Sequence, residues 1–187
     1  MMYGHNKGSA EIVRRIPFGS VGVEIGVWKG DSSEIFLERA SHLHMVDSWS
    51  VDAYRSSDEN GGFKSYLKRY GKLVGRPHES AFQSYYDAIY DSVVDRFADK
   101  PVTIHRCMSA EFFARFGLSV DWLYIDGSHS FDGCLADLDG ALSLATYALF
   151  GDDYGTKKGV TDAVNAFIEK TGFKLDVLCR KQYQIIL

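Results

Sequence analysis

Five apolar, strand-like runs alternate with helical patterns along most of this 187-residue chain. The clearest run spans residues 21–27, where β-branched and other apolar residues indicate a strand that is buried on both faces. A helical pattern follows it, and further strands are predicted at residues 42–49, 102–107, 120–126 and 147–151. This alternation predicts a doubly wound α/β fold with a mostly parallel sheet.

The chain closes with two more strand-like segments, residues 174–179 and 182–187, which are joined near Arg180 and Lys181. A connection this short favours an antiparallel hairpin at the end of the sheet. A length of 187 residues fits one domain with its own core, and no linker or internal repeat divides the sequence. We therefore predict one domain over residues 1–187.

Residues 50–80 break the alternation. A polar, glycine-containing stretch is followed there by lysines and arginines that are interleaved with Phe63, Tyr66 and Tyr70. Because long insertions in compact domains are usually functional or disordered, we predict a lid over the substrate, with a solvated surface excursion as the alternative. Beyond it, Ser80 with Gln83 resembles the capping box that begins a helix.

Composition narrows the classes of partner. The net charge of −4 gives no broad attraction to nucleic acid or to an anionic membrane. The three cysteines are widely spaced and form no CxxC pair, so neither a zinc cluster nor a disulfide framework is predicted. The sequence contains no apolar run of membrane-spanning length. We expect a cytoplasmic protein without nucleic-acid or membrane partners, and we leave open whether it forms a homo-oligomer.

Three acids follow two of the predicted strands. Asp126 ends the fourth strand, and Asp152 with Asp153 ends the fifth. Ligands of parallel sheets collect at the carboxyl ends of the strands, and three unpaired carboxylates would repel one another there. A hard divalent cation such as Mg²⁺ would relieve that repulsion, so these acids are predicted metal ligands. The alternatives are a strand-end cap for Asp126 and a turn or helix-capping pair for the other two.

His129 lies three residues beyond Asp126 and is a candidate general base, because the unperturbed imidazole pKa is near neutrality. A hydrogen-bonded structural role is the alternative for this residue. His42 and His44 share one face of a predicted strand but lack further ligand partners in the sequence, so no metal site is predicted at that place.

A glycine-containing turn after the first strand indicates a nucleotide-like cofactor. Gly26 and Gly30 bracket this turn, and Asp47 follows at the distance of an acid that binds ribose hydroxyls. The dinucleotide fingerprint requires a glycine where this chain has Trp28, and an indole there would obstruct a pyrophosphate. S-adenosylmethionine has no phosphate, and Glu24 favours its cationic methionine part. NAD stays open as the alternative cofactor.

These motifs resemble those of a known family. Residues 24–30, Glu-Ile-Gly-Val-Trp-Lys-Gly, resemble the first motif of class I S-adenosylmethionine-dependent methyltransferases. Residues 124–133, 151–154 and 159–164 resemble, more narrowly, small sugar and natural-product O-methyltransferases, whose relatives include macrocin-type and cephalosporin-hydroxylase-like enzymes. One departure from that family is that this chain has Ala-Thr-Tyr-Ala at residues 145–148, where a Pro-Gly-Gly-like turn usually precedes the fifth strand.

The resemblance implies a Rossmann-like, seven-stranded sheet with the cofactor across the first two strand ends. It implies that the methionine part lies among Glu24, Gly26, Trp28 and Gly30, with the ribose at Asp47, adenine near Ser109, and metal at Asp126, Asp152 and Asp153. We therefore predict S-adenosylmethionine-dependent, metal-assisted O-methylation of a small-molecule hydroxyl on a sugar or natural product. The alternatives are metal-independent N- or O-methylation, a NAD-dependent oxidoreductase, and a non-catalytic ligand-binding module.

Overall fold

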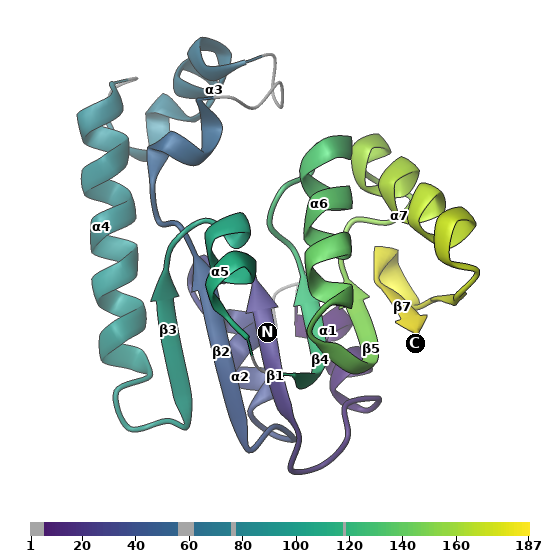
Figure 1. Ribbon diagram of the computed structural model, residues 1–187. Coiled ribbons are helices and arrows are strands. Elements are labelled where there is room, and N and C mark those ends of the chain that lie inside the picture. Colours follow the sequence, from purple (N-terminus) through teal and green to yellow (C-terminus); the bar gives the residue numbers. More distant parts are fainter. Residues whose placement is uncertain (1–5, 56–61, 76–77, 118) are drawn as a thin grey trace.

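The seven strands form one sheet in the order β3-β2-β1-β4-β5-β7-β6 (Figure 1). The structure is a computed structural model that describes residues 6–55, 62–75, 78–117 and 119–187. Its strands are β1 (Val21–Ile25), β2 (His42–Asp47), β3 (Val102–Arg106), β4 (Val120–Ile125), β5 (Ala145–Gly151), β6 (Lys174–Val177) and β7 (Tyr183–Ile186). Strands β1 to β5 pair in parallel, whereas β7 runs antiparallel to both β5 and β6. The predicted doubly wound sheet with a C-terminal antiparallel hairpin is confirmed.

Helices cover both faces of the sheet. They are α1 (Asn6–Val13), α2 (Asp31–Phe36), α3 (Phe63–Tyr70), α4 (Glu79–Arg96), α5 (Ser109–Arg115), α6 (Phe131–Leu142) and α7 (Lys158–Thr171). In β4, Trp122 and Tyr124 enter a core with α2 and α4, while Leu123 and Ile125 enter a second core with α5, α6 and α7. Because both faces of these strands are buried, the strands are apolar almost throughout. No helix in the described residues is long and apolar enough to cross a membrane.

The predicted lid segment is partly helical. Its described residues form the short 3₁₀ helix η1 (Val51–Tyr54), α3, the 3₁₀ turn η3 (Gly71–Leu73) and the start of α4, while residues 56–61 and 76–77 lie outside the described part. Tyr66 is buried: its ring stacks on Tyr54 at 4.1 Å between centroids, and its hydroxyl shares a hydrogen bond with Tyr86 of α4. The interleaved aromatic side chains therefore attach this segment to α4, whereas Lys64 and Lys68 stay exposed.

The start of α4 differs from the prediction. Helix α4 begins at Glu79, and its N-cap is His78, whose ring nitrogen accepts a hydrogen bond from the Ser80 amide at 3.3 Å. Gln83 forms no capping box with Ser80. Its side-chain amide instead donates to the Trp49 carbonyl and accepts from the Val51 amide, each at 3.2 Å. The predicted capping box is wrong because the turn after β2 recruits this glutamine.

Three histidines gather where β2 lies beside β3. His44 Nδ1 and His105 Nε2 are 3.1 Å apart, and the His42 ring lies 4.9 Å from the His44 ring, centroid to centroid. Burial lowers the pKa of His44 to about 4, and the neighbouring imidazoles of His42 and His105 act in the same direction. The sequence did not reveal His105 as a neighbour, because the contact depends on the register of β2 against β3.

This cluster predicts an acid-sensitive stability. Since the folded-state pKa of His44 lies below the unfolded value of 6.5, the folded state loses stability as the pH falls from 6.5 towards 4. We expect a loss of about 1 kcal/mol from this half-buried group between pH 7.5 and 5.5. Urea unfolding of the wild type and of His44→Gln at both pH values measures it. An equal loss in the variant would show that His44 is not responsible.

Candidate active site

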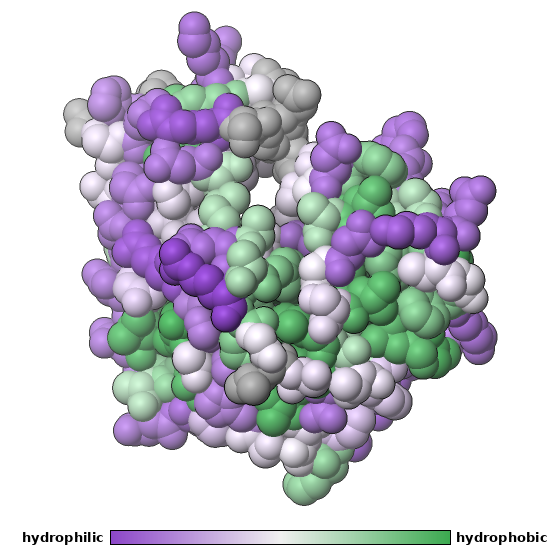
Figure 2. Space-filling view, in the orientation of Figure 1, coloured by the Kyte–Doolittle hydropathy of each residue, from purple (hydrophilic) through white to green (hydrophobic). Residues whose placement is uncertain are grey.

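The ends of the parallel strands define the candidate site. Strands β1, β2, β4 and β5 point the same way, and Figure 2 shows a hollow above their carboxyl ends, between the part that carries α3 and the part that carries α6. Backbone hydrogen bonds extend the pairing beyond the strands, since Gly26 donates to Val46 at 2.9 Å and Asp126 donates to Ile25 at 2.8 Å. The structure therefore brings the predicted cofactor turn beside the first predicted metal ligand.

The turn after β1 is as tight as its glycines suggest. Gly26 has φ +90°, and a Cβ atom there would lie 2.1 Å from the carbonyl oxygen of Asp126. Gly30 has φ +79° and lies against the ring of Phe97 at the end of α4. Between them, Trp28 adopts a left-handed φ of +49° with its side chain 50% exposed. The indole thus projects from the turn and does not fill the space beneath it.

Asp47 connects two turns through their backbone. One carboxylate oxygen accepts from the Trp28 amide at 2.9 Å and the other from the Trp49 amide at 2.8 Å, while the Trp49 indole donates to the Trp28 carbonyl at 2.8 Å. Burial raises the pKa of Asp47, although these backbone donors oppose the rise. Both tryptophans have positive φ, a conformation that costs energy outside glycine and needs support from its surroundings. Asp47 supplies that support.

Glu24 is buried behind the turn that follows β1. Its side chain is buried and accepts a hydrogen bond from the Ser33 hydroxyl of α2. Burial raises the pKa of Glu24 to about 8, and the carboxylates of Asp126 and Asp47 raise it further, against the effect of Ser33. With this pKa the Glu24 carboxyl is mostly protonated at neutral pH, and a cation bound in the hollow would favour its ionised form.

Ser109 opens α5 and contacts a buried acid that the sequence analysis did not select. Asp137 of α6 is 4% exposed, and it is hydrogen-bonded to Ser109 and to the backbone of Ser128. Burial raises the pKa of Asp137 to about 6, and these hydrogen bonds oppose the rise. Asp137 thus ties the loop after β3 to the loop after β4. A signal was present, because this acid stands on the apolar face of α6 beside Cys134 and Leu138.

The predicted metal ligands split into two groups. His129 Nε2 lies 3.2 Å from Asp153 Oδ2 and 3.6 Å from Asp126 Oδ1, and ligand atoms of all three residues lie within 4.8 Å of one another. Asp152 is not a member of this group. Its Oδ2 pairs at 2.9 Å with Lys181 Nζ, which also lies 2.5 Å from Asp153 Oδ1. Lys181 comes from the 3₁₀ turn η4 (Cys179–Lys181) between β6 and β7.

The charges of this acidic cluster are only partly balanced. Burial raises the pKa of Asp126 to about 6; the charges of Asp152 and Asp153 also raise it, while His129 opposes them. Burial likewise acts to raise the pKa of Asp153, but the hydrogen bond and charge of Lys181 hold that pKa below its usual value. Negative charge is therefore less well balanced at Asp126, whose side chain is 31% exposed, than at Asp153.

The donor set fits a divalent ion. Two carboxylates and one imidazole are close enough to share a cation, and Asp152 Oδ1 is buried without a hydrogen-bond partner among the described residues. Carboxylates suit Mg²⁺ and Mn²⁺, whereas an imidazole ligand favours transition metals over Mg²⁺. The residues therefore fit a metal site, in which Asp126 and Asp153 would be the primary ligands.

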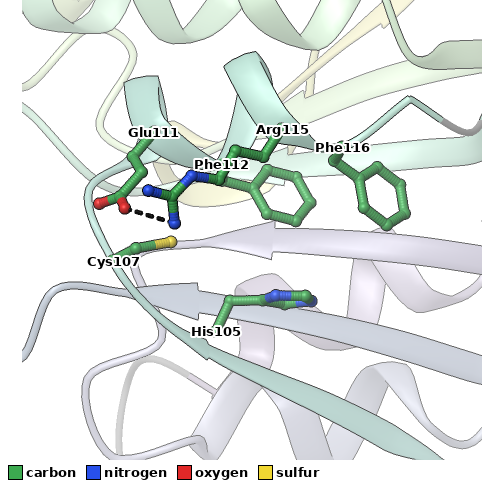
Figure 3. A pocket seen from close by; sticks show the side chains of 6 residues that line it. All are labelled: His105, Cys107, Glu111, Phe112, Arg115 and Phe116. Atoms are coloured by element: carbon green, nitrogen blue, oxygen red, sulfur yellow. Dashed lines mark ion pairs between the residues drawn. The ribbon is translucent and has the colours of Figure 1, made fainter.

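A separate pocket lies outside this site. It has a volume of about 250 Å³ and lies between β3 and α5, where Figure 3 shows Phe112 and Phe116 facing His105, with Cys107 nearer the Glu111–Arg115 ion pair. None of the predicted cofactor, catalytic or metal residues lines it. The chemistry of the strand ends and this pocket are therefore distinct features of the protein.

Comparison with known families identifies the class. The methyltransferase-domain family matches residues 23–148, so the chain belongs to this family. The prediction that the protein is a methyltransferase is confirmed, and the match does not support the oxidoreductase alternative. No curated protein matches the sequence at a significant level.

Solved structures share the fold at low sequence identity. The O-methyltransferase NovP has a TM-score of 0.62 and 17% identity, over 97% of this chain and 78% of NovP. The O-methyltransferase TomG of Streptomyces achromogenes, involved in tomaymycin synthesis and solved with SAM, has a TM-score of 0.59 and 12% identity, over 100% and 81%. A Streptococcus mutans protein described as a methyltransferase, solved in complex with SAH, has a TM-score of 0.59 and 11% identity, over 100% of this chain and 99% of that protein. Others with similar scores are described as rRNA methylases.

Proposed function

We propose that this protein transfers the methyl group of S-adenosylmethionine to a hydroxyl of a small molecule, with a divalent ion at the acidic cluster. One observation carries the proposal: the glycine turn held by Asp47 lies beside Asp126, whose side chain joins His129 and Asp153. A donor at the turn would thereby face a proton acceptor and candidate metal ligands. The family and the solved O-methyltransferases of the same fold support this assignment.

The cofactor would lie across the ends of β1 and β2. In this arrangement Gly26 and Gly30 let the backbone approach the methionine part, and Trp28 borders it with its exposed indole. The Asp47 carboxylate, which already accepts from the backbone around Trp28 and Trp49, would also accept from the ribose hydroxyls. Ser109 would border the adenine, and Glu24, once it ionises beside the cationic cofactor, would attract the sulfonium and ammonium.

His129 would accept the proton of the acceptor hydroxyl while the hydroxyl oxygen attacks the methyl carbon, and the carbon–sulfur bond breaks to release S-adenosylhomocysteine. Asp153 and Asp126 flank the imidazole, so they orient it and favour the charged form that the proton transfer creates. A divalent ion bound mainly by Asp126 and Asp153, with Asp152 beside them, would lower the pKa of the acceptor hydroxyl. Alignment of oxygen, methyl carbon and sulfur supplies a further part of the rate.

The acceptor in this proposal is a sugar or another polyol-like natural product. Vicinal hydroxyls suit chelation at a carboxylate-bound ion, and two of the solved structures with this fold are named O-methyltransferases. A net charge of −4 gives no general attraction to RNA. Residues 50–80 would act as a lid over the acceptor, and the cysteine usage agrees with a cytoplasmic location within the same proposal.

Asp47→Ala is expected to weaken S-adenosylmethionine binding by roughly 10- to 100-fold, because it removes the ribose acceptor and the support of two strained turns. Isothermal titration calorimetry measures the affinity directly. Asp121→Ala is the matched control, since this acid also accepts from a backbone amide, that of Val21, but at the opposite end of the sheet. Equal affinities for wild type and Asp47→Ala would refute the ribose role.

A second function is favoured by one contact. Lys181 already pairs with Asp152 and Asp153, which suits metal-independent methyl transfer to a small molecule. Methyl transfer from radiolabelled S-adenosylmethionine to a panel of small polyols, with and without EDTA, separates the two functions. We expect EDTA to abolish transfer and added Mg²⁺ or Mn²⁺ to restore it. Full activity in EDTA would establish the metal-independent enzyme instead.

A further inference from the structure

Lys181 stands where a metal ion would otherwise balance the acidic cluster. Its ammonium contacts one oxygen of Asp152 at 2.9 Å and one oxygen of Asp153 at 2.5 Å. Both acids are more than nine-tenths buried, so their charges have little water to screen them. Within the described residues, Lys181 is the lysine or arginine that pairs with these two carboxylates.

The backbone holds Lys181 in this position. The residue adopts a positive φ of +97°, and its carbonyl accepts a hydrogen bond from the Tyr154 amide at 2.8 Å. A lysine with positive φ is strained, and such strain persists only when the surroundings enforce it. The hairpin turn between β6 and β7 is therefore fixed to the loop that follows β5, and it carries the ammonium into the cluster.

The contacts of Lys181 divide the oxygens of the cluster. Asp153 Oδ1 faces Lys181 and the Thr156 hydroxyl, whereas Asp153 Oδ2 faces His129. Asp152 Oδ2 faces Lys181, and Asp152 Oδ1 has no hydrogen-bond partner among the described residues. A divalent ion could engage Asp126 and the outer oxygen of Asp153 with Lys181 in place. Binding to Asp152 as well would bring two cations close together.

We propose that Lys181 is a resident cation that competes with the divalent ion and so sets a weak metal affinity for this site. The inference rests on the proposed metal site, and it adds a positioning residue that the sequence motifs did not include. Lys181 keeps Asp152 and Asp153 in place when metal is absent, and it opposes metal through like-charge repulsion. Its removal should therefore expose both carboxylates to the ion.

The test measures metal binding alone, without donor or acceptor. Titration of Mn²⁺, followed by the electron paramagnetic resonance of the free ion, gives the affinity for wild type, Lys181→Met and Lys181→Arg. We expect Lys181→Met to bind Mn²⁺ roughly 10- to 100-fold more tightly than wild type, because one positive charge has left the site. Lys181→Arg keeps the positive charge and should stay within about threefold of wild type.

Two further variants keep the test decisive. Lys158→Met removes an exposed lysine that pairs with Asp162 on α7, and it should leave Mn²⁺ binding unchanged. Lys181→Gln replaces Lys181→Met if the methionine variant does not fold. The proposed competition is refuted if Lys181→Met or Lys181→Gln binds Mn²⁺ no more tightly than the wild type, or if no variant binds Mn²⁺. The proposed methyl transfer fails on a different result, namely no methylated product with any acceptor, so the two failures are distinguishable.

Discussion

Gly26→Ala is expected to abolish cofactor binding and to destabilise the fold by more than about 3 kcal/mol. The reason is steric: the new Cβ would lie 2.1 Å from the Asp126 carbonyl oxygen, and φ is +90°. Relief requires the end of β1 to separate from β4, where the Asp126 amide donates to the Ile25 carbonyl at 2.8 Å. Urea unfolding and calorimetry with S-adenosylmethionine measure the two effects.

The matched control is Gly172→Ala, at the end of α7. Gly172 also has a positive φ, of +74°, but no atom lies within 4 Å of its added Cβ. This variant should lose only about 1 kcal/mol, the cost of a left-handed conformation, and it should bind the cofactor normally. If Gly26→Ala and Gly172→Ala lose equal stability and both retain cofactor affinity, the close approach of the β1 turn to Asp126 is not needed for cofactor binding.

Asp126→Asn is expected to lower methyl transfer by roughly 10²- to 10⁴-fold while raising stability, a combination that marks a functional acid. Activity falls because the variant loses a carboxylate beside His129 and a metal ligand. Stability rises because burial, with the charges of Asp152 and Asp153, raises the pKa of Asp126 to about 6 in the folded protein. At pH 7.5, removal of this charge should stabilise the metal-free protein by about 1–2 kcal/mol, allowing for its partial exposure.

The sign of this effect follows from linkage. An acid whose pKa is raised by folding costs stability as the pH rises from its unfolded value towards the folded value, here from 3.8 to about 6. The wild type should therefore lose stability over that interval relative to Asp126→Asn, in unfolding curves recorded with EDTA. Asp139→Asn is the control, because Asp139 of α6 is an acid on the surface that pairs with Lys170 of α7. An active or destabilised Asp126→Asn would contradict the assignment.

The fold could be predicted from the sequence because the patterns that indicate strands and helices are local. Apolar strands such as residues 21–25 and 120–125 are buried on both faces, and helices separate them, so a mostly parallel sheet could be predicted from the alternation. The acids at the strand ends were equally visible, since the carboxyl ends of parallel strands share one edge. Those residues predict where ligands should bind.

The features of the site that could not be predicted depend on contacts between distant parts of the chain. Lys181 lies in a predicted turn, and nothing in its neighbourhood indicates that it reaches Asp152 and Asp153. Asp47 was assigned to the ribose, but its hold on two tryptophan amides requires the geometry of both turns. Asp137 differs from these residues, because its burial could have been predicted from the sequence. An acid on the apolar face of a helix indicates a buried side chain with a specific partner.

A crystal structure with bound S-adenosylhomocysteine tests the central claim most directly. The proposal predicts the ribose hydroxyls within hydrogen-bond distance of the Asp47 carboxylate, and the sulfur atom directed across the hollow towards Asp126 and His129. A ligand bound instead in the pocket between β3 and α5, or with its sulfur directed away from the acidic cluster, would contradict it.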